Sequence, residues 1–261
     1  MESSITYLVI CAAALSASAL SLLSGFGLGT VLTPAFAIFF PITIAVALTA
    51  IVHFLNNVFK LILVGRYADR NTVIRFGIPA IPASILGAQV LVWLANQKPL
   101  VDYHIHGHGF EITVVKLVVA GMMMLFALLE MVPRLEQVSF DRKYFPVGGI
   151  LSGFFGGLSG HQGALRSAFL VKSGLSKESF IGTAVVIAIL VDIPRISVYV
   201  ANFSLAGSRH DLALVLAATL SAFLGAFVGT RWIKKTTIGN IQVLVAIMLF
   251  VVALALGSGL I

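Results

Sequence analysis

Long apolar blocks that alternate with short polar connections are the dominant pattern along the chain. The blocks cover residues of about 5–40, 42–65, 74–96, 112–132, 146–171, 179–201, 211–232 and 240–260. Six of these blocks are about 20–24 residues long, which is the length of one helix that crosses a bilayer. The pattern therefore predicts an all-α, polytopic helical membrane protein that lies in contact with the lipid bilayer.

The first and fifth blocks are longer than one span, and glycine and proline interrupt both of them. The interrupting residues are Gly25, Gly27, Gly29 and Pro34 in the first block, and Gly156, Gly157, Gly160 and Gly163 in the fifth. Glycine and proline at this density break a helix. Since non-helical backbone at membrane depth needs protein or water around it, we expect broken or re-entrant helices. Whether the first block is a span plus a half-helix or a hairpin stays open.

Short matching segments recur in the same order in the two halves of the chain. The matches are Ser24-Gly25-Phe26 with Ser152-Gly153-Phe154, Gly27–Leu32 with Gly160–Leu165, Thr49-Ala50 with Thr183-Ala184, and Leu86-Gly87-Ala88 with Leu224-Gly225-Ala226. Self-similarity of this kind indicates internal repeats. We therefore expect one transmembrane domain over residues 1–261, built from a first repeat of about 1–135 and a second of about 140–261.

Basic residues concentrate in four of the polar connections. They are Arg66, Arg70 and Arg75 after the second block, Arg134, Arg142 and Lys143 between the halves, Lys172 and Lys177 after the fifth block, and Arg231, Lys234 and Lys235 after the seventh. All four connections are cytoplasmic only if the first and fifth blocks return to the side that they entered. The two halves then have inverted topology, which is a common architecture of secondary transporters, with the site at the bilayer midplane between broken helices.

Two blocks carry polar side chains at helical spacing. His53, Asn57 and Lys60 share one face of the second block, and Asp192 and Arg195 share one face of the sixth. In the repeat alignment Asn57 corresponds to Asp192, and Lys60 corresponds to Arg195. A charge at the bilayer centre costs about 2.5–3.5 kcal/mol on the insertion scale, so these side chains are expected to face the protein interior.

Structural roles explain the same residues one at a time. Asp192 and Arg195 are one helical turn apart and can neutralise each other. Lys60 can extend toward the headgroups, and Asn57 can join two helices through hydrogen bonds. These interpretations stay open for each residue, but together the residues favour a polar cavity lined by both halves.

Polar side chains also stand at the interruption of the fifth block, where His161 and Gln162 lie between glycines and Arg166 follows one turn later. The N-termini of broken helices add unpaired N–H donors. The buried cations Lys60, Arg166 and Arg195 also outnumber the one buried acid, Asp192. We therefore expect the cavity to bind a small anion. Asp192 or His161 can change protonation during a cycle, so proton coupling is a further hypothesis.

Composition and charge agree with this interpretation. Hydrophobic residues form 59% and charged residues 10% of the chain, against about 45–50% and about 25% in soluble domains. The net charge of +7 is attributed to cytoplasmic connections rather than to nucleic-acid binding. The chain has one cysteine, which excludes an intramolecular disulfide.

Three alternating histidines, His104, His106 and His108, lie near Asp102 and Glu111 in a long connection. These side chains are of the types that bind Zn²⁺ or Cu²⁺, but a flexible polar loop with incidental histidines is the preferred interpretation. We expect neither a metal nor a cofactor. The sequence lacks the zinc-protease, phosphate-loop and nucleophile-elbow motifs, so we do not expect an enzyme.

The glycine-rich segment Ser24–Thr30 with Thr33-Pro34, its echo Gly156–Gly163, the two halves and the length resemble the sulfite exporter TauE/SafE family of membrane permeases. The resemblance covers nearly the whole chain. It implies a multi-pass protein of the bacterial inner membrane that transports sulfite or an organosulfonate such as sulfoacetate, with export as the expected direction. One departure is Ser167, preceded by Arg166, at the position that matches Pro34.

These observations define the expected site. The predicted anion contacts are His161, Gln162, Arg166 and Arg195, with Asn57 and Lys60 from the first half and backbone N–H groups near Gly27, Gly29, Gly160 and Gly163. Asp192 and His53 are the predicted coupling residues, and Asp192 either orients Arg195 or takes up a proton. An anion channel and a membrane-embedded enzyme or metal-handling protein are the alternatives. A homodimer is also considered.

Overall fold

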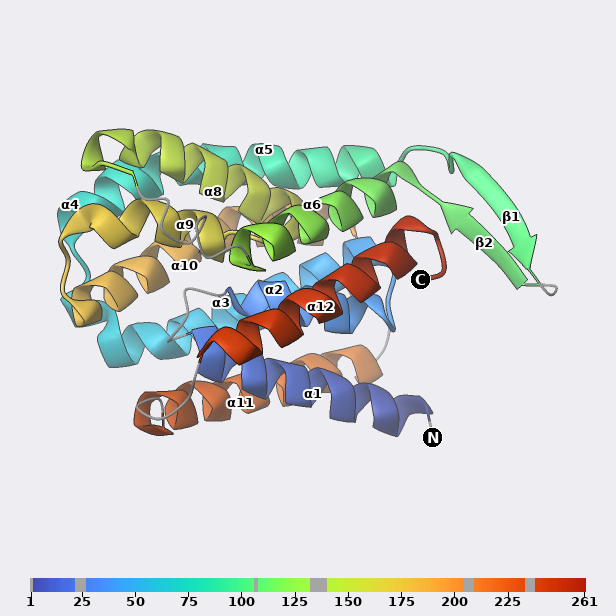
Figure 1. The fold of residues 1–261 in the computed structure, drawn as a ribbon, viewed down its shortest axis with the longest axis horizontal. Helices are drawn as coiled ribbons and strands as arrows, with labels where there is room; N and C mark the ends of the chain where they lie inside the picture. Colours follow the sequence, from blue (N-terminus) through green and yellow to red (C-terminus); the bar gives the residue numbers. More distant parts are fainter. Residues whose placement is uncertain (1, 22–26, 106–107, 132–139, 204–208, 233–237) are drawn as a thin grey trace.

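The computed structural model describes the chain except for residues 1, 22–26, 106–107, 132–139, 204–208 and 233–237 (Figure 1). The helices are α1 (Glu2–Ser21), α2 (Leu28–Ala37), α3 (Ile42–Val64), α4 (Arg70–Thr72), α5 (Ile78–Ala95), α6 (Val114–Met131), α8 (Phe145–Ser159), α9 (Gly163–Leu170), α10 (Lys177–Asn202), α11 (Arg209–Trp232) and α12 (Ile238–Gly257). A π-helical turn at Val73–Gly77 joins α4 to α5, and short 3₁₀ turns stand at Gly65–Tyr67, Arg142–Tyr144 and Val171–Ser173. Among the sequence features above, Ser24-Gly25-Phe26, His106, Arg134, Lys234 and Lys235 lie outside the described residues.

Five helices in the described part of the chain are long and apolar enough to cross a membrane. They cover Ser4–Ser21, Ile42–Tyr67, Arg70–Ala95, Lys177–Asn202 and Leu212–Gly229. Large apolar side chains on them face outward, among them Ile62, which is 80% exposed, and Leu8, which is 71% exposed. Such surfaces suit a hydrocarbon solvent, so the predicted multi-pass helical membrane protein is confirmed.

Both long blocks are interrupted where the sequence predicts a break. The first block divides into the 20-residue α1 and the 10-residue α2, and the fifth divides into α8 and α9. Gly160 ends α8 in the left-handed conformation, with φ 84°, and its N–H donates to the Gly156 carbonyl at 3.0 Å. A side chain at this position would be strained.

The two ends of the fifth block lie side by side. Arg142, just before α8, donates from Nε to the carbonyl of Ser173, just after α9, at 2.9 Å. In Figure 1 the α3–α4 connection and the first turns of α8 and α10 lie at the left, and both termini lie at the right. The basic residues Arg66, Arg142 and Lys177 therefore share one end of the molecule, which we call the basic end.

Helices α5 and α8 cross in direct backbone contact. Gly153 lies against the carbonyl of Ala80, and Gly157 lies against the carbonyl of Ser84, so closely that a β-carbon would overlap either oxygen. Glycine is required here because only hydrogen leaves room for the neighbouring carbonyl.

The packing pairs of the two halves correspond to each other. Helix α8 packs on α5 of the first half, and α1 packs on α11 of the second; α3 packs on α10, and α6 packs on α12. The glycines of the two matched triplets occupy equivalent crossings, because Gly87 meets the carbonyl of Phe154 and Gly225 meets the carbonyl of Leu15.

Two apolar clusters hold the helices together. The larger one runs through most helices and includes Leu32, Phe36 and Met123, each fully buried. The smaller one lies nearer the basic end, where Phe76, at the π-helical turn, packs edge-on against Phe169 of α9 with ring centroids 6.2 Å apart. This second cluster fixes the far end of the broken fifth block.

The long connection after α5 differs from the prediction of a flexible loop. It forms a two-stranded antiparallel hairpin, β1 (Val101–Ile105) and β2 (His108–Ile112), at the right of Figure 1. Tyr103 stacks on Phe110 with ring centroids 5.5 Å apart. Apolar residues alternate with polar ones along both strands, and this period of two is the strand signal. The expected loop was wrong because histidines and charges obscured that alternation.

Candidate functional site

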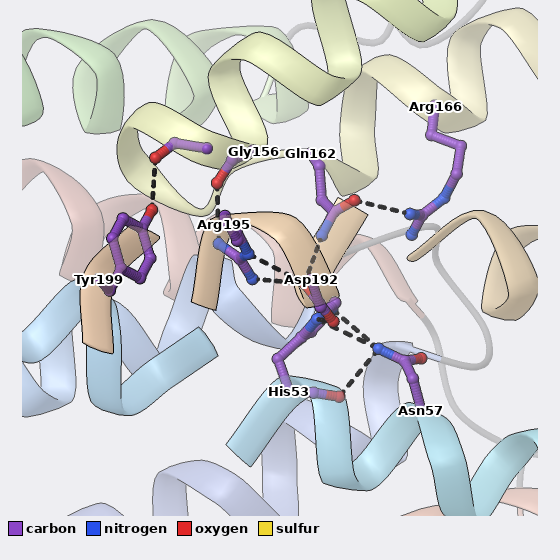
Figure 2. A network of polar contacts seen from close by, with 9 residues as sticks. His53, Asn57, Gly156, Gln162, Arg166, Asp192, Arg195 and Tyr199 are labelled. Carbon is purple, nitrogen blue, oxygen red and sulfur yellow. Dashed lines mark hydrogen bonds and ion pairs between the residues drawn. The ribbon is translucent and has the colours of Figure 1, made fainter. Parts of the chain in front are cut away.

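Asp192 is the centre of a buried polar network between α3, α8, α10 and the break before α9 (Figure 2). Its Oδ1 accepts hydrogen bonds from Arg195 Nε at 3.0 Å, Arg195 Nη2 at 2.7 Å and Gln162 Nε2 at 3.2 Å. Its Oδ2 accepts one from His53 Nδ1 at 2.6 Å. A carboxylate with four donors around it is fully satisfied.

His53 connects the first half of the chain to this carboxylate. Because Asp192 can only accept, His53 Nδ1 carries the hydrogen. Asn57 Nδ2, one turn along α3, then donates both to the His53 carbonyl at 2.9 Å and to ring Nε2 at 3.2 Å. Both ring nitrogens of His53 are thus paired in its neutral form.

Arg195 and Tyr199 donate to two carbonyls in the last turn of α8, directly before the break in the fifth block. Arg195 Nη1 donates to the Gly156 carbonyl at 2.8 Å, and the Tyr199 hydroxyl donates to the Gly157 carbonyl. The last carbonyls of a helix need such partners when they are buried. Asp192 therefore holds Arg195 against the interrupted end of α8.

Gln162 links this network to Arg166. The Gln162 side chain donates to Asp192 and accepts from Arg166 Nη1 at 3.1 Å, and its carbonyl accepts from Ser152 Oγ at 3.1 Å. Arg166, only 8% exposed, lies one turn into α9. The predicted polar residues of the break are therefore joined to the predicted polar face of α10.

A cavity of about 120 Å³ lies between the two halves, beside this network. Its lining residues are Ser21, Gly27, Leu28, His53, Asn57, Lys60, Arg166, Ser167, Lys177, Phe180, Ile181, Ala184 and Val185. The first residue of α10, Lys177, places its opening toward the basic end. Lys60, Arg166 and Lys177 are cationic, and the described lining contains no Asp or Glu. Such a surface attracts anions.

Lys60 is nine-tenths buried in this wall with neutral partners. Its Nζ donates to Ser21 Oγ at 2.8 Å. The Asn56 amide is assigned with its oxygen toward Lys60 Nζ, at 3.1 Å, and its nitrogen toward the Ala222 carbonyl, at 3.2 Å, because this orientation pairs both atoms. The ammonium charge is therefore stabilised by hydrogen bonds to neutral groups rather than by an acid.

The two helix breaks meet beside the cavity. A β-carbon on Gly27 would lie 3.5 Å from the Gly163 nitrogen, and one on Gly29 would lie 2.8 Å from the Gly160 carbonyl oxygen. The N-termini of α2 and α9 consequently converge, and their unpaired N–H groups add to the positive potential.

The predicted site residues divide into two groups. His53, Asn57, Lys60, Arg166 and Gly27 line the cavity, whereas Gln162, Asp192, Arg195, His161, Gly29, Gly160 and Gly163 lie behind its wall. Sequence reasoning missed Ser21, which lines the cavity from the end of α1, and counted Lys177 only as a loop charge. No local pattern marks Ser21, because only the tertiary packing of α1 on α2 and α3 brings it to Lys60.

His161 lies at the break itself. Its Nδ1 is 3.1 Å from Ser159 Oγ, and its ring stacks on Phe126 of α6 with centroids 5.4 Å apart and planes at 6°. Its Nε2 is buried without a hydrogen-bond partner in the described structure.

The hairpin places its histidines at neighbouring positions of the strand register, where His104 pairs with Gly109 and His108 pairs with Ile105. Within the described residues no three His, Cys, Asp or Glu side chains form a group that could hold a metal ion.

Comparison with family models decides the family of the chain. Residues 10–256 match the model described as Sulfite exporter TauE/SafE. The chain belongs to the sulfite exporter TauE/SafE family. No curated protein and no solved structure matched it. TauE/SafE proteins are membrane transporters, so the five apolar helices and the interior polar site belong to a permease scaffold.

Proposed function

We propose that this TauE/SafE protein moves a small sulfur oxyanion, sulfite or a C2 organosulfonate such as sulfoacetate, across the bacterial inner membrane, and that it acts in export. The main support for this proposal is the cavity between the two halves. Its described lining contains Lys60, Arg166 and Lys177 and no acid. At about 120 Å³ it is smaller than the roughly 300–1,000 Å³ of typical organic-ligand pockets, which favours the smallest of these anions.

An inverted repeat with re-entrant first and fifth blocks is part of the proposal. The corresponding packing pairs of the two halves support it, and so does the contact between Arg142 and Ser173, because it brings the two ends of the broken fifth block together. The Lys/Arg bias assigns the basic end to the cytoplasm. The cavity then opens inward, as an exporter requires for loading its substrate.

The roles of the side chains follow from their positions. Lys60, Arg166 and Asn57 contact the anion first, together with backbone N–H groups near Gly27 and Gly163. Arg195, Gln162 and His161 take part once the network behind the wall rearranges. For Asp192 and His53, the predicted coupling residues, the four hydrogen bonds to the carboxylate support the orienting role of Asp192 over proton uptake there.

Counterflow of ³⁵S-sulfite and of labelled sulfoacetate in proteoliposomes tests this proposal. We expect saturable exchange that Arg166→Gln lowers by about tenfold, which is the effect of about 1.4 kcal/mol of lost binding. Lys143→Gln is the matched control, because Lys143 is exposed near the basic end but does not line the cavity.

Three results would contradict the proposal in different ways. Absence of flux of either anion would overturn the substrate class. Conductance without saturation or counterflow would indicate an anion channel. Loss of flux on addition of a chelator would indicate a metal-handling protein.

A further inference from the structure

Three buried polar atoms in the described part of the chain lack hydrogen-bond partners: Thr33 Oγ1, Thr49 Oγ1 and His161 Nε2. They come from α2, α3 and the break before α9, where Gly29 of α2 meets Gly160. A β-carbon on Gly160 would lie 3.5 Å from Thr33 Oγ1, and Gly29, which faces the Gly160 carbonyl, also faces the Thr49 methyl group. A buried polar group without a partner is costly, so three of them near the contact of Gly29 with Gly160 require an explanation.

The hydrogen bonds of His161 define what its free nitrogen can do. The Ser159 hydroxyl donates to the Phe155 carbonyl at 3.2 Å, so Ser159 Oγ accepts from His161 Nδ1. Nε2 therefore carries a lone pair in the neutral ring. An anion can accept a hydrogen bond from Nε2 only after Nε2 itself has taken up a proton.

The charged surroundings of His161 favour joint binding of a proton and an anion. From α10, Arg195 Nη1 lies 3.4 Å from the position of a β-carbon on Gly160. From α9, Arg166 is bound to Gln162, and the His53 ring on α3 is bound to Asp192. The α2 and α6 neighbours are Thr33 and the Phe126 ring, neither of them titratable here. A positive charge on His161 is repelled by the nearby Arg195, and a bound anion offsets this repulsion.

Resting on the transport function proposed above, we propose that the break at Gly160–Gln162 forms a second, occluded subsite for the same oxyanion. In this subsite the hydroxyls of Thr33 and Thr49 and a proton on His161 Nε2 donate to the oxygen atoms of the anion. The proton is taken from water as the anion enters and returns to water as the anion leaves, and no covalent bond of the anion changes. The two binding events are linked, because each raises the affinity for the other.

The hydrogen bonds place the proposed proton uptake at His161 rather than in the Asp192 network. Every described hydrogen-bonding position of the His53 ring and of the Asp192 carboxylate is occupied, whereas His161 Nε2 has none. Arg166, which lines the open cavity, is hydrogen-bonded to Gln162, which stands next to His161.

The test measures sulfite flux and proton flux together, with ³⁵S-sulfite outside proteoliposomes that contain a pH-sensitive dye. Sulfite itself exchanges protons with the buffer, so the informative quantity is the difference between variants. We expect about one proton fewer per sulfite in His161→Asn, which keeps a donor near Nδ1 but has no titrating nitrogen. His161→Gln is the second variant, and His104→Asn is the control, because His104 is exposed in the hairpin.

Two isosteric changes test the subsite separately. Thr33→Val and Thr49→Val should each raise the KM for sulfite by about fivefold, the effect of one neutral hydrogen bond, and leave the proton ratio unchanged. An unchanged ratio in folded His161 variants overturns the proton step, and wild-type KM values in both threonine variants overturn the subsite. Absence of sulfite flux in the wild-type protein overturns the proposed function instead.

Discussion

Gly29 of α2 faces the carbonyl oxygen of Gly160, so that a methyl group on Gly29 would lie 2.8 Å from that oxygen. This contact joins the two interrupted blocks, because Gly29 stands just inside α2 and Gly160 ends α8. The obstacle is backbone rather than a flexible side chain, so it cannot move aside without displacing the break.

Gly29→Ala should therefore separate the two breaks and disrupt the site between them. We expect a lower Tm in detergent and loss of most sulfite flux. Gly121→Ala is the control, since a β-carbon on Gly121 of α6 meets nothing within 4 Å, and alanine there favours the helix by about 0.5–1 kcal/mol. Wild-type flux in Gly29→Ala would show that the breaks need not touch.

The buried pair of Asp192 and Arg195 should be strongly coupled. Removing one partner leaves the other charge buried, which costs about 3–5 kcal/mol. Asp192→Asn and Arg195→Gln should each lower Tm substantially, while the double variant should recover part of the loss, as measured by a double-mutant cycle. Asp141→Asn is the control, because Asp141 lies 4.0 Å from Lys143 with both side chains exposed. Strict additivity at the buried pair would contradict this prediction.

Lys177 should act on the rate of anion entry more than on binding. It stands at the first residue of α10 on the rim of the cavity, where its charge guides an approaching anion. Lys177→Gln should lower kcat/KM at low ionic strength, and the difference from wild type should shrink as salt approaches about 0.15 M, where the Debye length is about 8 Å. A salt-independent loss would instead place Lys177 in direct contact with the bound anion.

Asp69 should contribute to stability in a pH-dependent manner. Its Oδ1 accepts hydrogen bonds from Thr72 Oγ1 at 2.6 Å and Thr72 N at 2.8 Å, which hold the pKa of Asp69 below its usual value. A lowered pKa means that this stabilisation is present at neutral pH and is lost as the pH falls through the folded-state pKa.

Replacement of Asp69, which caps this helix, tests the direction of the pH dependence. Asp69→Ala should cost about 0.5–2 kcal/mol at neutral pH, and the difference in Tm from wild type should shrink below about pH 4, near the ordinary pKa of Asp. Asp69→Asn keeps the cap without titrating, so its Tm should lack this pH dependence. A constant difference between Asp69→Ala and wild type down to acid pH would contradict the assignment.

The sequence predicted the features that local chemistry controls. The interruption at Gly160 follows from glycine density, and the shared face of Asp192 and Arg195 follows from helical spacing; both are present. The bond between His53 and Asp192 was beyond such reasoning, because the two residues are 139 positions apart and only the packing of α3 on α10 joins them. For the same reason, the sequence could not show that Arg195, a predicted anion contact, lies behind the cavity wall rather than in it.

The glycine crossings have a mechanical consequence. Where Gly153 and Gly157 lie on the α5 carbonyls, a shift of one residue would drive Phe154 or Leu158 into the same backbone, so α5 and α8 cannot slide past each other. The close contacts hold α5 and α8 together, and those of Gly225 and Gly229 hold α1 and α11 together in the same way. In the transport cycle proposed above, we expect movement to concentrate where side chains fill the interface, above all between α3 and α10, where His53 meets Asp192. The polar network then lies at the interface that has to move.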